Sequence, residues 1–191
     1  MSAALDDRIL LGARRAVERH GWRDATLERI AAEAGTSRMT LHRRGVTRDA
    51  VLDALATSLE EQYRSALWPA LTAPGTGRER LEQALRALCG VADENLQLFA
   101  ALGDRRRAEI FHEDGGARLT RRTFTEPVER LLRDGAADGS LRPVDDPAET
   151  ATVLFNLIGW TYRHLRSGHE WTPERATESV VRIALDGVSA R

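Results

Sequence analysis

The stretch "AGTSRMTLHRRGVTRDAVL" (residues 34–52) decides the fold, because it predicts a short polar helix with a glycine break on either side. Ser37 stands where the N-cap of that helix belongs, and Gly45 stands where the helix should end. Apart from Met39, Leu41 is the only large apolar residue of this helix. We therefore expect Leu41 to anchor the helix while its other side chains face outward.

Working outward, the preceding residues predict two more helices. Apolar residues recur every three or four positions over residues 3–20, which Gly21 ends, and Thr26 caps a second helix whose inner face includes Ile30. Two short helices joined by a tight glycine turn, the second rich in Arg, Thr and Ser, are the sequence pattern of a helix-turn-helix. The pattern predicts an N-terminal domain that binds DNA.

The distribution of charge favours the same interpretation. Residues 1–50 hold ten arginines and seven acidic residues, whereas the rest of the chain holds 18 and 22, for a formal net charge of -1. No acidic residue lies between Glu33 and Asp49, and this segment contains Arg38, Arg43, Arg44 and Arg48. Arg, Ser and Thr are the usual partners of the DNA backbone. A solvated charged face is the alternative, and the glycine turn, the two caps and the missing acids weigh against it.

Composition excludes several classes of protein. The chain of 191 residues is 42% hydrophobic and 30% charged, which suits a folded, soluble helical protein. No apolar run reaches about 18 residues, so no membrane span is expected, and the acidic start "MSAALDDRIL" is unlike a signal peptide. We expect a cytoplasmic protein without a cofactor. Cys89 is the only cysteine, which excludes an internal disulfide and a cysteine-based zinc site.

The remaining sequence predicts helices and no strand, so the expected fold class is all-α with about nine helices. A long fourth helix opens at Thr47, and the loop "TAPGTG" (72–77) follows it. Further helices are expected over residues 78–92, 94–103, 105–113, 117–137, 147–166 and 173–188, the last capped by Thr172. We expect two domains, a DNA-binding one over residues 1–50 and a larger helical one over residues 51–191.

The stretch "TLERIAAEAGTSRMTLHRR" (residues 26–44) closely resembles the N-terminal domain of the tetracycline-repressor (TetR) family of transcriptional regulators. The resemblance covers about residues 9–52. A second, weaker match is "GSLRPVDDPAETATVLFNLIGWT" (residues 139–161), which looks like the usual entry into that family's eighth helix. The resemblance implies a three-helix DNA-binding domain followed by a helical domain that binds a small molecule and dimerises.

Matched position by position, the resemblance implies a set of DNA-facing residues that lie on the second helix, the turn, the recognition helix and the start of the fourth helix. They are Thr26, Thr36, Ser37, Arg38, Met39, Thr40, His42, Arg43, Arg44 and Arg48. Arg38 and Arg43 can offer bidentate contacts to guanine, and Met39 and Thr40 can touch thymine methyl groups.

Two positions depart from the family pattern. His42 stands where the family usually has a tyrosine, and Gly45 stands where it usually has a phenylalanine that packs the third helix onto the first. We expect Val46 and Trp22 to fill the space of that missing ring, and Gly45 to end the helix in the left-handed conformation. These departures bear on base specificity more than on DNA binding itself.

The larger half carries most of the aromatic residues, and core packing is the alternative for each of them. The resemblance suggests as pocket residues Trp68, Cys89, Phe99, Phe124 and Trp160. Residues 148–165 are apolar nearly all round a helix, and such a helix must be buried on every side. With the last helix, this pattern predicts a four-helix interface between two copies, formed by Phe155, Ile158, Tyr162, Val180 and Ile183. Burial of both helices within one chain is the alternative.

The hypothesis is thus a homodimeric regulator, most simply a repressor, that leaves a near-palindromic operator when it binds an inducer. An adaptor that has lost DNA reading and a small helical enzyme are the rivals. The sequence has no Ser-His-Asp spacing and no phosphate-binding glycine loop, so no catalytic residue is assigned. In "DRRRAEIFHED" (104–114) the three arginines suit a solvated helix face, and His112 has no second histidine at metal-ligand spacing.

Overall fold

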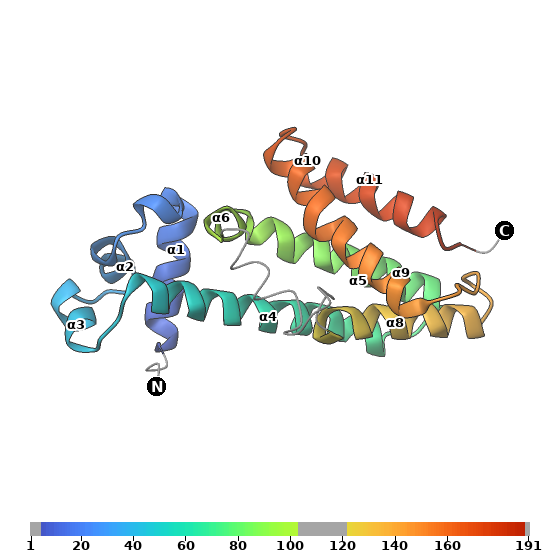
Figure 1. The fold of residues 1–191 in the computed structure, drawn as a ribbon, viewed down its shortest axis with the longest axis horizontal. Coiled ribbons are helices and arrows are strands. Elements are labelled where there is room, and N and C mark those ends of the chain that lie inside the picture. Colours follow the sequence, from blue (N-terminus) through green and yellow to red (C-terminus); the bar gives the residue numbers. More distant parts are fainter. Residues whose placement is uncertain (1–4, 103–121, 190–191) are drawn as a thin grey trace. The chain divides into compact units, whose positions relative to one another are not determined.

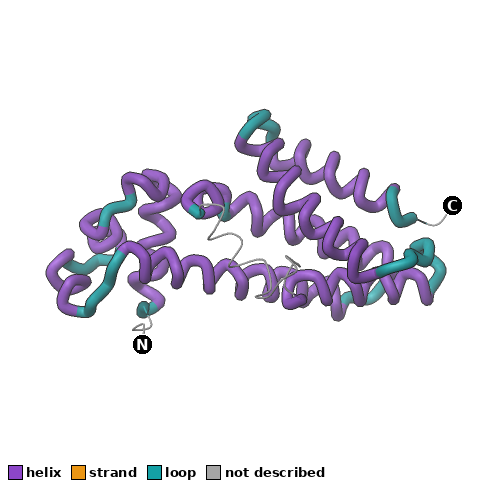
Figure 2. Tube along the Cα trace, viewed as in Figure 1, coloured by secondary structure: helices purple, strands orange, loops and turns teal. Residues whose placement is uncertain are grey.

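The computed structural model describes residues 5–102 and 122–189. These residues are helical throughout, apart from connecting loops and one isolated antiparallel bridge between Leu141 and Ser189, and they include no strand (Figures 1 and 2). The predicted all-α fold class is confirmed. The expectations for residues 105–113, including the arginines of 105–107 and His112, lie outside the described residues.

The helices follow one another through short loops, and nine are present in the described ranges when three contiguous pieces near the C-terminus are taken as one. Their bounds are α1 Asp7–Asp24, α2 Leu27–Glu33, α3 Arg38–Arg43, α4 Arg48–Thr72, α5 Gly77–Glu94, α6 Leu96–Ala101, α8 Arg122–Ala137, α9 Pro147–Asn156, η1 Leu157–Tyr162, α10 Arg163–Ser167 and α11 Pro173–Asp186.

The chain forms two compact units. One contains α1, α2, α3, the first part of α4 and α6, and the other contains the rest of α4, α5 and the helices from α8 onward. The divisions fall between Glu61 and Gln62, inside α4, and between Leu96 and Gln97.

In the first unit, α1 packs closely on α2. Ile9, Val17 and Ile30 are among the buried residues at this contact. At Gly12, an added Cβ atom would lie 2.6 Å from the backbone nitrogen of Ala34, so no larger residue fits without a shift. The first helix differs from its expected range of 3–20. Asp6 caps it, and it continues past Gly21 to Asp24 across a kink where Gly21 has a φ of 68°.

The second unit is built around α5, which packs against α8, η1 and α11. Its core includes three stacked or edge-on rings: Tyr63 lies 5.7 Å from Phe124, and Phe124 lies 5.3 Å from Phe155, measured between centroids. All three rings are buried. Burial raises the pKa of the Tyr63 hydroxyl well above its ordinary value.

The predicted helix over residues 147–166 is interrupted by a π-helical stretch. Here α9, η1 and α10 run on continuously, and η1 carries the wider π-helical turns. The Tyr162 hydroxyl donates to Asp93 of α5 at 3.0 Å, and Arg166 donates to the same carboxylate oxygen. These bonds hold the wide turn and the following helix against α5. A π-helical turn leaves no mark in the spacing of apolar residues that predicts a helix.

Candidate nucleic-acid interface

Helices α2 and α3 form a helix-turn-helix, and each begins at a side-chain cap. The hydroxyl oxygen of Thr26 accepts from the Arg29 N–H at 3.3 Å, and that of Ser37 accepts from the Thr40 N–H at 3.1 Å. These contacts satisfy backbone donors that a helix start otherwise leaves without a partner. Both predicted caps are therefore confirmed, and they fix where α3 begins.

One buried apolar residue packs α3 against the rest of the first unit. Leu41 is fully buried, whereas Met39 has 69% of its surface exposed. Gly45 ends the helix in the left-handed conformation with a φ of 66°, and the Val46 N–H then bonds the Leu41 carbonyl at 3.0 Å. This turn brings Val46 into the core. The expectations for Leu41 and Gly45 are confirmed, and Val46 is buried as its predicted packing role requires.

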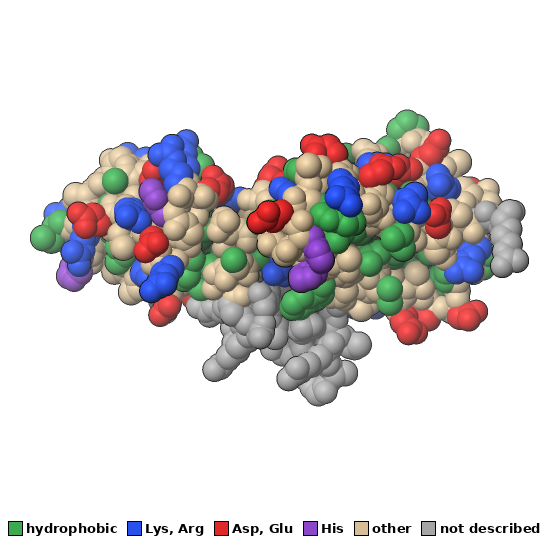
Figure 3. All heavy atoms as spheres, turned by 90° about the horizontal axis from the view of Figure 1, so that it is seen from above, with side chains coloured by type: hydrophobic (Ala, Val, Ile, Leu, Met, Phe, Trp, Pro, Cys, Tyr) green, Lys and Arg blue, Asp and Glu red, His purple; other side chains and the backbone are tan. Residues whose placement is uncertain are grey.

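The other predicted DNA-facing residues of α3 lie on its solvent side. Arg38, His42 and Arg43 are exposed, and Thr40 is half-buried with its hydroxyl 3.0 Å from that of Ser37. Arg and His side chains gather over the end of the first unit that α3 forms, at the far left of Figure 3. Thr36, in the turn, is half-buried. Whether these side chains meet DNA is not tested by their exposure, so their role stays a prediction.

Two arginines at the C-terminal side of α3 have partners within the first unit. Arg44 forms an ion pair with Asp6, with 2.6 Å between its nitrogen and the carboxylate oxygen. This guanidinium, together with the Ile9 N–H, holds the pKa of the Asp6 carboxyl below its ordinary value. Arg48 lies 4.6 Å from the centre of the Trp22 ring and donates to the Trp22 carbonyl.

Arg48 has contacts within the first unit, and its role toward DNA stays a prediction. Its side chain is half-buried against Trp22, and its Nε atom is enclosed. The physical reason is a cation–π contact, which holds a guanidinium over an indole ring more firmly than solvent does. The Trp22 ring lies against the Arg48 guanidinium, and its filling of the space of the missing aromatic stays a prediction. No sequence pattern indicates this contact, because the two residues lie 26 positions apart.

The predicted pocket residues differ in their exposure to solvent. Cys89, Phe99 and Phe124 are buried, but Trp68 and Trp160 expose 65% and 54% of their surface. The role of the two tryptophans as pocket residues stays a prediction. Phe99 belongs to the first unit, whereas Cys89 and Phe124 belong to the second. Phe124 lies within the cluster with Tyr63 and Phe155, which sequence reasoning did not group together.

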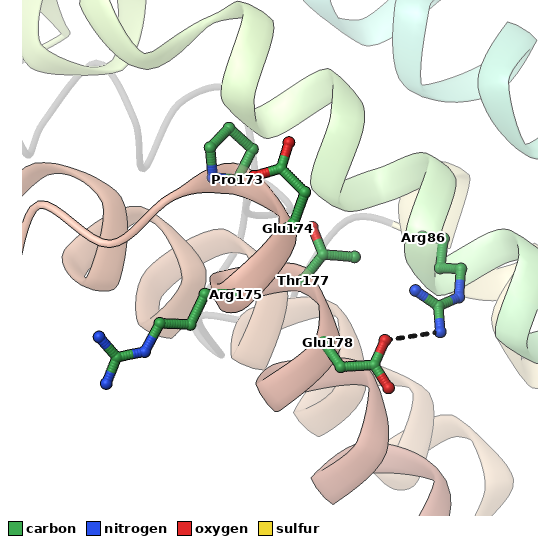
Figure 4. A pocket seen from close by; sticks show the side chains of 6 residues that line it. All are labelled: Arg86, Pro173, Glu174, Arg175, Thr177 and Glu178. Carbon is green, nitrogen blue, oxygen red and sulfur yellow. Dashed lines mark hydrogen bonds and ion pairs between the residues drawn. The ribbon is translucent and has the colours of Figure 1, made fainter.

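A cleft between α5 and the start of α11 is large enough for a small molecule, at about 600 Å³ (Figure 4). Arg86 points into it and bonds Glu178 at 3.0 Å and Glu82 at 2.9 Å. Arg175, also at its rim, lies 3.8 Å from the centre of the Trp171 ring. The Arg86 charge is therefore already matched by two carboxylates.

The predicted dimer residues are mostly core residues of one chain. Phe155, Ile158, Tyr162 and Val180 are buried within the single chain, which matches the alternative that these helices pack inside one copy, and their role at a dimer interface stays a prediction. Ile183 is 58% exposed. Sequence reasoning missed Val153, which is exposed on α9 two helical turns before Trp160. A helix with apolar residues all round still has one side in the core and one side facing solvent. The spacing of the apolar residues does not indicate which side is which.

The structure also bears on metal sites, membrane-spanning helices and the one cysteine. Within residues 5–102 and 122–189, no three metal-ligating side chains come together. None of the helices in these ranges combines the length and the apolar character that a membrane crossing requires. Burial raises the pKa of the Cys89 thiol to about 12, which keeps it protonated and unreactive at neutral pH.

A capped helix-turn-helix with an exposed basic recognition helix, followed by a larger helical unit, defines a class of DNA-binding regulators. Comparison with family profiles agrees. The profile of "Bacterial regulatory proteins, tetR family" matches residues 9–55, and that of "Tetracyclin repressor-like, C-terminal domain" matches residues 74–188. The chain belongs to the TetR family of DNA-binding transcriptional regulators. Regulators of this family are transcription factors and not enzymes.

Solved structures share the fold at low sequence identity. A TetR/AcrR-family regulator from Thermobifida fusca is 23% identical, with 94% of this chain and 96% of that one covered and a TM-score of 0.69. The TetR-family regulator PfmR from Thermus thermophilus is 20% identical over 94% and 98%, with a TM-score of 0.68. A protein studied for control of antibiotic production by bacterial hormones is 20% identical over 96% of both chains, with a TM-score of 0.74. No curated protein sequence gives a significant match.

Proposed function

We propose that this protein is a homodimeric repressor that binds a near-palindromic operator and leaves it when a small molecule binds the second unit. The observation that carries the proposal is the division of α3 into one buried anchor and an exposed face. Leu41 is buried, while Arg38, His42 and Arg43 face solvent. In this arrangement, residues 1–50 read DNA in the cytoplasm, and residues 51–191 bind the inducer and dimerise.

The base-reading step would belong to Arg38 and Arg43. In the described part of the chain neither guanidinium has a hydrogen bond or an ion pair, so neither must break a contact before it meets DNA. A guanidinium matches the two acceptors of a guanine edge in the major groove. Met39 and Thr40 offer apolar contact to thymine methyl groups, and the Thr26 and Ser37 hydroxyls lie at helix starts, where phosphates bind.

Dimerisation would use the outer side of the last helices. Val153, Trp160 and Ile183 expose large apolar side chains on α9, η1 and α11 of one unit. The proposal requires these side chains to form one contiguous apolar patch, because such patches mark interaction sites. Two copies would then present their recognition helices to major grooves about 34–36 Å apart on one face of the duplex.

Regulation would come from a ligand in the second unit. The ring cluster of Tyr63, Phe124 and Phe155 supplies apolar surface to a ligand that parts the helices around it. A similar structure belongs to a study of control by bacterial hormones, which supports a small organic effector. Such an effector releases DNA only to the extent that it binds the non-operator state more tightly.

The first test replaces Arg43. An Arg43→Ala variant should bind its operator about 1–3 kcal/mol more weakly, because a bidentate guanine contact is lost. Fluorescence anisotropy with fragments of the gene's own upstream DNA measures the change. Arg130→Ala, an exposed arginine on α8, is the matched control and should bind as the wild type does. Equal affinity of the Arg43→Ala variant would remove Arg43 from the interface, and a wild type that selects no duplex from genomic DNA would overturn the proposal.

A further inference from the structure

The carboxylate of Asp6 makes two contacts that join the start of α1 to the end of α3. One oxygen accepts from the Ile9 N–H at 2.9 Å and so caps α1. The other accepts from the Arg44 guanidinium at 2.6 Å, across 38 positions of sequence. Asp6, the N-cap of α1, therefore contacts Arg44, the C-cap of the recognition helix.

The arginines of α3 and of its C-cap differ in whether an acidic side chain pairs with them. Arg44 is matched by a carboxylate, whereas no acidic side chain in the described residues pairs with Arg38 or Arg43. The ion pair stays open to solvent, since the Arg44 and Asp6 side chains are 50% and 43% exposed. A third charged group, such as a phosphate, can therefore approach it.

We propose that Asp6 competes with the DNA backbone for Arg44 and thereby weakens sequence-independent binding. The inference rests on the proposed DNA-binding function. Carboxylate and phosphate oxygens are alternative partners of a guanidinium, and the negative charge of Asp6 repels a phosphate that approaches Arg44. Binding to random DNA depends almost wholly on phosphate contacts, whereas operator binding also gains from base contacts. Asp6 thus weakens binding to random DNA, which has few other contacts to compensate for the loss.

The experiment compares two single charge removals. Asp6→Asn leaves the cap of α1 in place, because asparagine caps as well as aspartate, but it removes the charge that holds Arg44. Asp7→Asn removes the same charge from the next residue, which is exposed on the first turn of α1 and makes no contact with Arg44. Affinity for a random duplex and for the operator is measured by anisotropy across a series of salt concentrations.

The Asp6→Asn variant should bind random duplex about two- to fivefold more tightly at low salt, the effect typical of an exposed ion pair. Its log–log salt slope should steepen by about 0.9, one added phosphate contact. Asp7→Asn should leave the slope unchanged. In an Arg44→Ala background, Asp6→Asn should give no gain.

Three results would overturn the inference. The gain could be equal in the Asp6→Asn and Asp7→Asn variants, it could persist without Arg44, or Asp6→Asn could bind more weakly while its circular dichroism is native. If Asp6→Asn folds poorly, Asp6→Ser supplies another uncharged N-cap for the same comparison. Failure of the wild type to bind any duplex would instead overturn the proposed function, and this is measured first.

Discussion

At the scale of single residues, α3 depends on few contacts. Leu41 is the fully buried side chain of this helix, and Ser37 and Gly45 set its two ends. The residues between these fixed points face solvent, apart from the half-buried Thr40. Substitutions at Arg38 or His42 should therefore alter DNA reading with little effect on folding, because surface changes away from caps and core cost little.

Gly12 gives a stability prediction at this scale. Gly12→Ala should lower the free energy of unfolding by about 1–3 kcal/mol, since its methyl group would meet the Ala34 backbone and overpack the α1–α2 contact. Urea unfolding followed by circular dichroism measures the change. Gly90→Ala is the control, because no atom lies within 4 Å of its Cβ position. That variant should gain up to about 1 kcal/mol from helix propensity. A neutral Gly12→Ala variant would contradict the close packing.

Sequence reasoning succeeds at this scale where the cause is local. Thr26 and Ser37 are identified as caps because a cap bonds a backbone N–H three residues away. It fails where the partner is distant. The contacts of Arg48 with Trp22 and of Arg44 with Asp6 join residues far apart in sequence, and no spacing rule predicts them.

At the scale of elements, the chain repeats one construction: a cap, an amphipathic helix and a short loop. Asp146 caps α9 by accepting from Ala148 and Glu149, and Thr172 caps α11 by accepting from Arg175. Helix starts are thus predictable. The side of α9 and η1 that faces the core is not predictable from the sequence, because apolar residues lie on every side of both helices. The packing partner decides it, and Phe155 and Ile158 are inside while Val153 and Trp160 are outside.

The outer side gives an element-scale prediction. Trp160→Glu should weaken the proposed dimer by about 30-fold or more, because a central interface tryptophan typically contributes at least 2 kcal/mol. Sedimentation across a range of protein concentrations measures the dissociation. Trp68→Glu makes the same change at a tryptophan that is exposed on α4, and it should leave the association unchanged. A Trp160→Glu variant that stays dimeric would place the interface elsewhere.

At the scale of the whole molecule, one helix belongs to both compact units. The division of the chain falls between Glu61 and Gln62, inside α4. The part of α4 in the second unit is therefore joined by continuous helix to Arg48, which follows the recognition helix. We expect effector and operator to weaken each other's binding by the same factor, as linkage requires.

Cys89 yields a prediction for the whole folded chain. Its thiol pKa of about 12 lies above the ordinary value of 9.0, so the native chain keeps a proton that the unfolded chain loses first. The stabilising effect is complete below about pH 9 and is lost as the pH rises toward 12. At pH 8 the Cys89 thiol of the native protein should react with a thiol reagent only at the rate at which the folded chain opens. In urea, where the chain is unfolded, the thiol should react at once. Rapid labelling of the native protein would contradict the burial.

Because the single native thiol is shielded, an introduced cysteine is chemically distinct without any further replacement. A nitroxide attached after Met39→Cys would sit on each recognition helix of a dimer. Pulsed electron resonance would then read the spacing of the two helices directly, with and without an effector, from a protein that needs no cysteine-free background.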